Sequence, residues 1–166
     1  GLIDAAEAFV AGGADWLCVH TIQEAEELRA AQITVPIHIV GPVPISQLCR
    51  LSALNASMVV YNDSTVDELI RLDQSVRLHL KVETGNHRQG VGLDDCLALG
   101  KKIVDSKTLE LEGICTHFSD IEDTTDHKFA RYQIIIFIIH SMKKVPDYRE
   151  KSSVIFNVYT IESNFY

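Results

Sequence analysis

The chain has 166 residues, 46% of them hydrophobic, which is enough to bury the core of one ordinary domain. Its 23 acidic and 15 basic residues give a net charge of −8, and no basic stripe could follow a phosphate backbone, which argues against nucleic acid as a partner. The longest apolar run, Ile134 to Ile139, is far shorter than the roughly 18 residues that a membrane span requires. No signal-peptide pattern opens the chain, so we expect a cytoplasmic protein with no membrane partner.

The cysteines predict neither a disulfide framework nor a zinc site. The chain has four, without CxxC spacing, and each lies in an apolar run: Cys18, Cys49, Cys96 and Cys115. Cysteines in such runs behave as small buried hydrophobic residues, which fits a reducing compartment.

Short β-rich runs alternate with amphipathic stretches, a pattern typical of parallel βαβ units. The expected helices are Asp4 to Val10, Ile22 to Ala31, Ile45 to Ala53, Thr65 to Leu72 and Leu93 to Asp105. The expected strands are Trp16 to His20, Ile37 to Gly41, Ser57 to Tyr61, Val76 to Glu83 and Leu109 to Phe118. Plausible caps mark two helix starts: Thr21 with Glu24 three residues later, and Ser64 or Thr65. The repeat has the length of one βα unit, so we expect all five strands to lie in one sheet.

The segment Val76 to Val91 is the most informative part of the chain. Along its strand His79, Lys81 and Glu83 alternate with apolar residues and therefore share one face. A turn then places Arg88 just past the end of the strand. A lysine among apolar neighbours is costly to bury unless it is paired or modified. The residue types alone fit equally well a surface strand whose Lys81 reaches out to water.

Three sequence blocks occur in a fixed order: ADWLCVHTIQEAEELRAA, KVETGNHRQGV and LEGICTHFSDIEDTTDH. Together they resemble the alanine racemase family, fold-type III enzymes that use pyridoxal 5'-phosphate on a parallel (β/α)8 TIM-type barrel. The second block keeps every fixed position of the family pattern K-V-[DE]-T-G-x-x-R-x-G, and the third keeps those of E-G-[IL]-x-T-H-F. The resemblance implies a site at the carboxyl ends of the barrel strands.

The resemblance assigns roles to three residues. Lys81 would be a catalytic lysine, carbamylated on its amine so that it becomes an anion and holds Arg88. Arg88 would be both catalytic and cofactor-binding, because in the family this arginine contacts the phenolic oxygen of pyridoxal phosphate; a guanidinium suits that role because it stays charged. His117 would pack against the pyridine ring. The plainer alternatives are a surface ion pair of Glu83 with Lys81 or Arg88, and a structural histidine at position 117.

Other candidate sites are weaker. The acidic run after His117, with Asp120, Glu122, Asp123, Asp126 and His127, contains metal-ligand types. Barrel hydrolases with bridged metals also carry an H-x-H pair on an early strand, which this chain lacks, so a loop and a helix N-terminus are the simpler interpretation and we expect no metal. Neither GxGxxG nor GxxxxGK[ST] occurs. We expect His20 to be structural or at the rim of the site, and we assign no role to His38.

A complete barrel needs about 250 residues, so we expect this chain to be an incomplete barrel. The first strand and the last strands would be missing, and so would the family's C-terminal β domain. Residues 1–166 would form one partial cofactor-binding domain, with residues 1–137 well matched and residues 138–166 divergent. No segment matches the K-x-x-A-Y-G-H-G motif, which holds the Schiff-base lysine. The opposing tyrosine comes from a partner subunit's C-terminal domain, so we expect the chain to be inactive alone.

The implied function is that of an alanine racemase, which interconverts L- and D-alanine and supplies D-alanine for peptidoglycan. The implied partners are alanine as substrate and a second subunit, since the full-length enzymes are homodimers. Two alternatives stay open: a non-catalytic pyridoxal-phosphate-binding barrel protein, and a degenerate remnant without enzymatic activity. The residues do not indicate which amino acid the site prefers.

Overall fold

A computed structural model describes residues 1–119 and 127–143 of the chain. Its centre is one parallel sheet of five strands in the order β1-β2-β3-β4-β5, so each strand pairs with the next one in the chain. The strands are β1 (Leu17–Val19), β2 (Ile37–Ile39), β3 (Ala56–Val60), β4 (Val76–Lys81) and β5 (Leu109–Cys115). The predicted sheet of five neighbouring parallel strands is confirmed.

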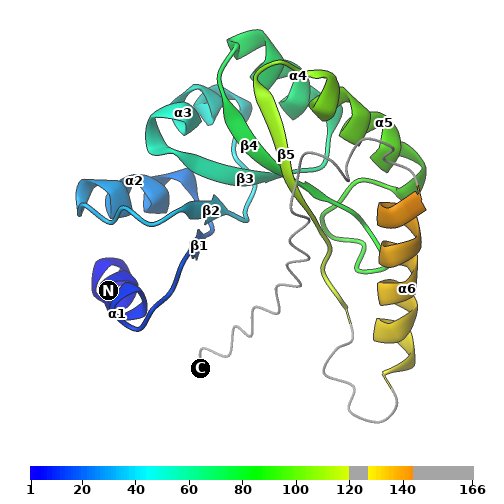
Figure 1. Ribbon diagram of the computed structural model, residues 1–166, viewed down its shortest axis with the longest axis horizontal. Coiled ribbons are helices and arrows are strands. Elements are labelled where there is room, and N and C mark those ends of the chain that lie inside the picture. The colour runs from blue at the N-terminus through cyan, green and yellow to red at the C-terminus, as the bar shows by residue number, and fades with distance from the viewer. Residues whose placement is uncertain (120–126, 144–166) are drawn as a thin grey trace.

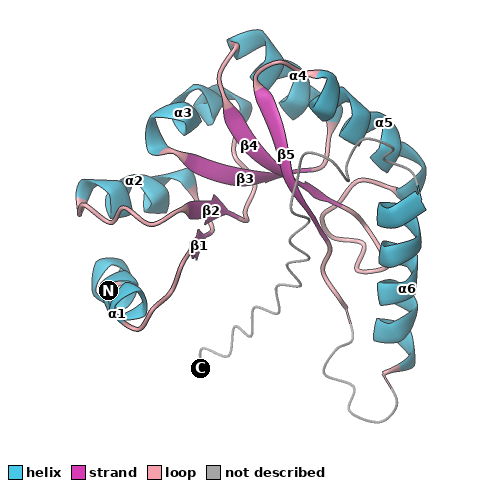
Figure 2. Cartoon of the chain, viewed as in Figure 1, coloured by secondary structure: helices cyan, strands magenta, loops and turns pink. Residues whose placement is uncertain are grey.

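Helices connect the strands and line one side of the sheet. They are α1 (Leu2–Ala11), α2 (Ile22–Ala30), the 3-10 helix η1 (Ile45–Arg50), α3 (Leu51–Leu54), α4 (Asp63–Leu72), α5 (Leu93–Asp105) and α6 (Lys128–Lys143). Figure 1 shows α2 to α5 along the convex side of the curved sheet, which we call the outer face, and the strands on its concave side, the inner face. The alternation of strand and helix in Figure 2 is that of a partial (β/α)8 barrel.

On the outer face of the sheet, the apolar residues of β4 pack against helix α5. Leu78 and Leu80 of β4 are almost fully buried in one cluster with Leu99 and Ile103 of α5. Burying aliphatic side chains of this size stabilises the fold by about 1.5 to 3 kcal/mol each. Since every second residue of β4 is used in this way, the polar residues between them are directed to the inner face.

Several boundaries differ from the expectation. The strands end earlier than predicted, β4 at Lys81 and β5 at Cys115, and the expected helix Ile45 to Ala53 is divided into η1 and α3. Ser64 and Thr65 are not the cap of α4. That role belongs to Asn62, whose side chain accepts a hydrogen bond of 2.9 Å from the backbone N–H of Thr65.

Other local expectations have mixed outcomes. The capping box of Thr21 and Glu24 is confirmed, because each side chain accepts a backbone N–H of the other residue. Cys96 and Cys115 are buried as expected, whereas Cys18 and Cys49 are exposed. An apolar run therefore did not suffice to predict burial: Cys18 takes the alternate face of a three-residue strand whose two other residues are buried.

Within residues 1–119 and 127–143, no helix is both long enough and apolar enough to cross a membrane. The sequence predicts that residues 138–166 diverge from the family. Of these, residues 144–166 lie outside the described residues.

Candidate active site

Lys81 is the last residue of β4 and is 9% exposed. It pairs with Cys115 of β5 and lies two positions after His79, which places it on the inner face at the carboxyl end of the strand. Its amine donates a 3.1 Å hydrogen bond to Oε1 of Gln89. Burial lowers the pKa of Lys81, and the positive charge of Arg88 lowers it further. The amine is therefore held next to an uncharged amide.

The loop after β4 is closed by backbone hydrogen bonds. The N–H of Val91 donates to the carbonyl of Lys81 at 2.8 Å, and the N–H of Glu83 donates to the carbonyl of Val91 at 2.9 Å. Gly90 makes this closure possible: its φ is +153°, and a Cβ there would lie 2.6 Å from the backbone nitrogen of Glu83. The final glycine of the K-V-E-T-G-x-x-R-x-G pattern is thus required by the close approach of two backbone segments.

Glu83 stabilises the tip of the same loop. Its carboxylate accepts the backbone N–H of Gly85 at 2.6 Å and that of Arg88 at 3.3 Å. Although burial opposes it, the backbone hydrogen bonds lower the pKa of Glu83. The carboxylate of Glu83 thus holds backbone amides and fixes where Arg88 leaves the loop, which differs from the plainer alternative of a surface ion pair.

His117 follows β5 and is partly buried. Burial lowers its pKa, and the positive charges of Arg88 and Lys81 lower it further. Arg88, which is exposed, thus acts through space on both Lys81 and His117. The structure brings together the three residues that the sequence singled out, at the carboxyl ends of β4 and β5.

A buried hydrogen-bond network ties these strand ends to α6. Thr116 donates to the carbonyl of Val82 at 2.9 Å, and its hydroxyl lies 2.7 Å from that of Thr84. Gln133 of α6, which is fully buried, donates to Thr84 at 3.3 Å and accepts the backbone N–H of Ser119 at 3.1 Å. No role was predicted for Gln133, although it begins a Q-x-x-x-F pattern that members of the resembled family share.

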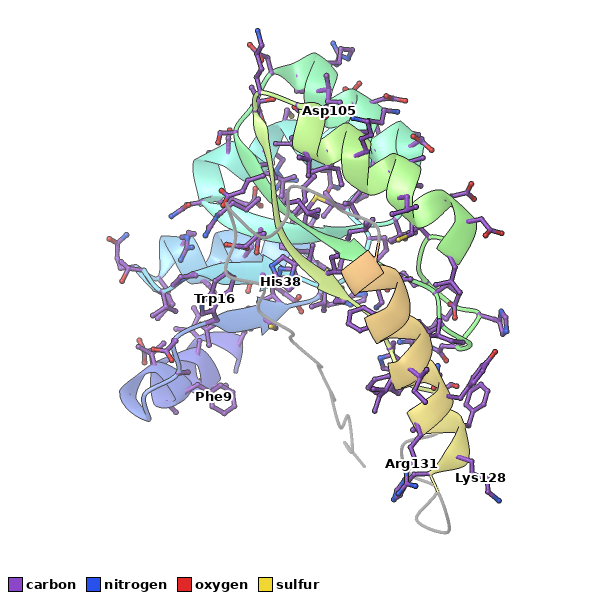
Figure 3. The ribbon with its side chains drawn as sticks, turned by 45° about the vertical axis from the view of Figure 1, so that its right-hand side comes forward. Phe9, Trp16, His38, Asp105, Lys128 and Arg131 are labelled. Atoms are coloured by element: carbon purple, nitrogen blue, oxygen red, sulfur yellow. The ribbon has the colours of Figure 1, made fainter. Side chains whose placement is uncertain are left out.

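A second polar group lies deeper on the inner face. His38 of β2, which Figure 3 labels, is fully buried, with its Nδ1 2.8 Å from the hydroxyl of Ser57 and its ring centroid 4.2 Å from that of His79. Burial first, and then the neighbouring His79, lowers the pKa of His38 to about 3. His79 in turn lies 3.0 Å from Oε2 of Glu112. No role was predicted for His38, because a lone histidine in an apolar run matches no motif.

The charges of the site fit an anionic ligand. Lys81, Arg88 and His117 are cations or potential cations, while the nearby carboxylate of Glu83 is engaged by backbone amides. The guanidinium of Arg88, which stays charged, is the donor that an oxygen anion of a bound ligand would need. In the described part of the chain, no three His, Cys, Asp or Glu residues are placed to hold a metal ion.

Residues 1–151 match the family model described as "Alanine racemase, N-terminal domain". The chain belongs to the alanine racemase family. It is 33% identical over 144 residues to an alanine racemase of Treponema denticola, covering 82% of this chain and 38% of that protein. It is 34% identical over 140 residues to alanine racemase 2 of Caldanaerobacter subterraneus, covering 80% of this chain and 35% of that protein.

Solved structures agree with this family assignment. The structure of alanine racemase from E. faecalis superposes with a TM-score of 0.78 at 28% identity, covering 84% of this chain and 39% of that chain. Histidine racemase from Leuconostoc mesenteroides reaches a TM-score of 0.81 at 18% identity, covering 93% of this chain and 42% of that chain, and shares the fold. The chain spans 35% to 42% of the length of these proteins.

Proposed function

We propose that this chain provides part of the pyridoxal-phosphate site of an alanine racemase that interconverts L- and D-alanine. The observation that carries the proposal is that Lys81, Arg88 and His117 lie within electrostatic reach of one another at the carboxyl ends of β4 and β5, beside the Glu83 carboxylate, which accepts backbone N–H groups. Alanine racemases depend on pyridoxal phosphate. We further infer a cytoplasmic homodimer of a protein that supplies D-alanine for peptidoglycan, as the family resemblance implies.

Each residue has a distinct task in this proposal. Arg88 binds the phenolic oxygen as a permanent donor, and His117 supports the flat face of the ring. Once carbamylated, Lys81 carries a negative charge and holds Arg88 in position. When bound, pyridoxal phosphate withdraws electrons from the amino acid's α-carbon so that its proton can be removed. The residues that move this proton have no counterpart among the motifs of this chain.

Pyridoxal-phosphate binding tests the proposal directly. The Arg88→Gln variant is expected to bind the cofactor at least about tenfold more weakly, because it loses a charge-assisted hydrogen bond of about 1.5 to 3 kcal/mol. Absorbance titration of the purified chain measures the affinity. Arg71→Gln is the matched control, since Arg71 is an exposed arginine that pairs with Glu68 on α4. Equal affinities of wild-type and Arg88→Gln chains would refute the assignment of Arg88.

The reduced adducts of pyridoxal phosphate with L- and D-alanine separate a racemase from a cofactor carrier. A racemase site accepts both enantiomers, so we expect both adducts to bind with similar affinity and more tightly than the cofactor alone. The same titration measures all three. Adducts that bind more weakly than the cofactor alone would favour the non-catalytic cofactor-binding protein instead.

Carbamylation of Lys81 is a further expected result. The reaction joins carbon dioxide to a neutral amine and releases one proton, and burial of Lys81 favours the neutral amine that it requires. In buffer with ¹³C-bicarbonate, we expect one carbamate carbon signal in the NMR spectrum, lost in Lys81→Met. Lys102→Met is the control and should keep the signal, because hydrogen bonds from Lys102 to Asp67 and Asp63 raise the pKa of that amine. A signal that survives in Lys81→Met would place the carbamate elsewhere.

A further inference from the structure

The pairing of β4 with β5 contains one irregularity. Leu78 pairs with Leu111, but the next residue, His79, pairs with Gly113, and Lys81 with Cys115. Glu112 is therefore an extra residue on β5, which makes a β-bulge. Bulges bend a strand and change the direction of the side chains that follow.

The bulge decides which face His117 occupies. Paired residues of neighbouring strands point to the same face, so Leu78 and Leu111 share the outer face, and Lys81 and Cys115 share the inner one. Without the extra residue, simple alternation from Leu111 would direct His117 to the outer face. A shift of one residue reverses every later side chain. With the bulge, the pairing of the two strands reaches Cys115, whose carbonyl accepts the N–H of Val82 at 2.8 Å. Alternation from Cys115 then directs His117, two positions later, to the inner face with Lys81.

The neighbouring residue Thr116 agrees with this counting. Its hydroxyl contacts Thr84, which in turn accepts a hydrogen bond from the buried Gln133 of α6. Thr116 therefore points toward the helix layer. Thr116 and Phe118 are buried and His117 between them is only partly buried, which is the alternation of an extended segment, so His117 points away from that layer.

Side chains of β4 hold the bulge in place. Oε2 of Glu112 lies 3.0 Å from Nε2 of His79, and Oε1 accepts a 3.2 Å hydrogen bond from Arg77. Although burial opposes it, the hydrogen bond from His79 and the charge of Arg77 lower the pKa of Glu112, so the carboxylate is ionised and accepts both donors. Gly113 leaves room for the ring of His79, because a Cβ there would lie 2.9 Å from Nδ1.

We propose that Glu112 and Gly113, held by His79, are positioning residues that turn His117 to the face of the sheet that carries Lys81. The bulge explains why a glutamate and a glycine are adjacent at the start of the EGICTHF segment. Glu112 is hydrogen-bonded to side chains of the neighbouring strand β4, and Gly113 leaves space for the ring of His79. The importance of that face rests on the proposed function, whereas the position of His117 does not.

The first test uses the unmodified chain. Backbone NOEs in an NMR spectrum are expected to pair His79 with Gly113 across the two strands. A regular pairing of His79 with Glu112 would overturn the proposal, and no variant needs to fold for this result.

The second test measures the electrostatic coupling of Lys81 with His117 in carbon-dioxide-free buffer, where Lys81 keeps its amine. In the wild-type background, Lys81→Met is expected to raise the pKa of His117, followed by NMR titration. In Glu112→Ala or Gly113→Ala backgrounds this shift should be lost, whereas Glu112→Gln, which keeps an acceptor, should retain much of it. Glu110→Ala, on an exposed residue of the same strand, is the matched control. A folded Glu112→Ala chain with the wild-type shift would sink the proposal. Pyridoxal phosphate is absent from both tests, so a failure of cofactor binding leaves their results unchanged.

Discussion

Replacing Gly90 with alanine is expected to lower the free energy of unfolding by about 3 kcal/mol, through backbone strain and overpacking together. The φ of Gly90 is +153°, which side chains rarely tolerate, and its Cβ would lie 2.6 Å from the nitrogen of Glu83. The nitrogen of Glu83 and the backbone next to Gly90 are held by the hydrogen bonds between Glu83, Val91 and Lys81, so neither segment can move aside without breaking them. Urea denaturation followed by circular dichroism measures the change.

Gly92→Ala provides the control for this prediction. Gly92 lies two residues further on and caps α5, with a φ of −61° and its nearest neighbouring atom 3.9 Å from an added Cβ. Its replacement should cost less than about 1 kcal/mol. Equal losses for the two variants would show that Gly90 is needed only for general chain flexibility and not for the closure of the loop.

Acid is expected to destabilise the chain through His38. The pKa of His38 is about 3 in the folded chain, against an ordinary value of 6.5, so as the pH falls below 6.5 the unfolded chain takes up a proton that the folded chain refuses. The stability that neutral His38 contributes is fully present above pH 6.5 and is lost as the pH falls toward 3. Between pH 7 and pH 4.5 this single group should remove about 3 kcal/mol of the free energy of unfolding. The groups around it are Ser57, His79, Glu112 and Lys81.

Denaturation curves recorded across this pH range compare wild type with His38→Leu. The variant should lose the part of the acid sensitivity that comes from position 38, because leucine has no proton to take up. His20→Leu makes the same substitution at an exposed position and should leave the pH dependence as in wild type. If His38→Leu and wild type lost stability in parallel on acidification, His38 would not be buried as a neutral ring.

Strand alternation and the family motifs sufficed to predict the five-stranded parallel sheet and the family of the chain. The alternation of His79 and Lys81 with leucines placed both on the inner face, because burial on one side of a strand fixes the direction of every residue. The same reasoning predicted a continuous strand from Leu109 to Phe118. The bulge at Glu112 was not predicted, because residues 109–113, LELEG, still alternate between apolar and polar or small residues.

Features that depend on contacts distant in sequence could not be predicted. His38 is buried beside Ser57 and His79, which come from two other strands, and no local sequence pattern predicts such a contact.

The cap of α4 was also not predicted, although it is a local feature. Asn62 competes with Ser64 and Thr65 for that position, and all three are good capping residues. Only the point at which the chain leaves β3 decides among them.

The residues proposed to hold the cofactor all come from one stretch of chain, β4, the loop before α5, and the end of β5. Lys81, Arg88 and His117 therefore depend on a single pair of adjacent strands for their mutual geometry. A one-residue change in the register of β4 against β5 would therefore displace Lys81 and His117 relative to each other and disrupt the site at two of its three residues.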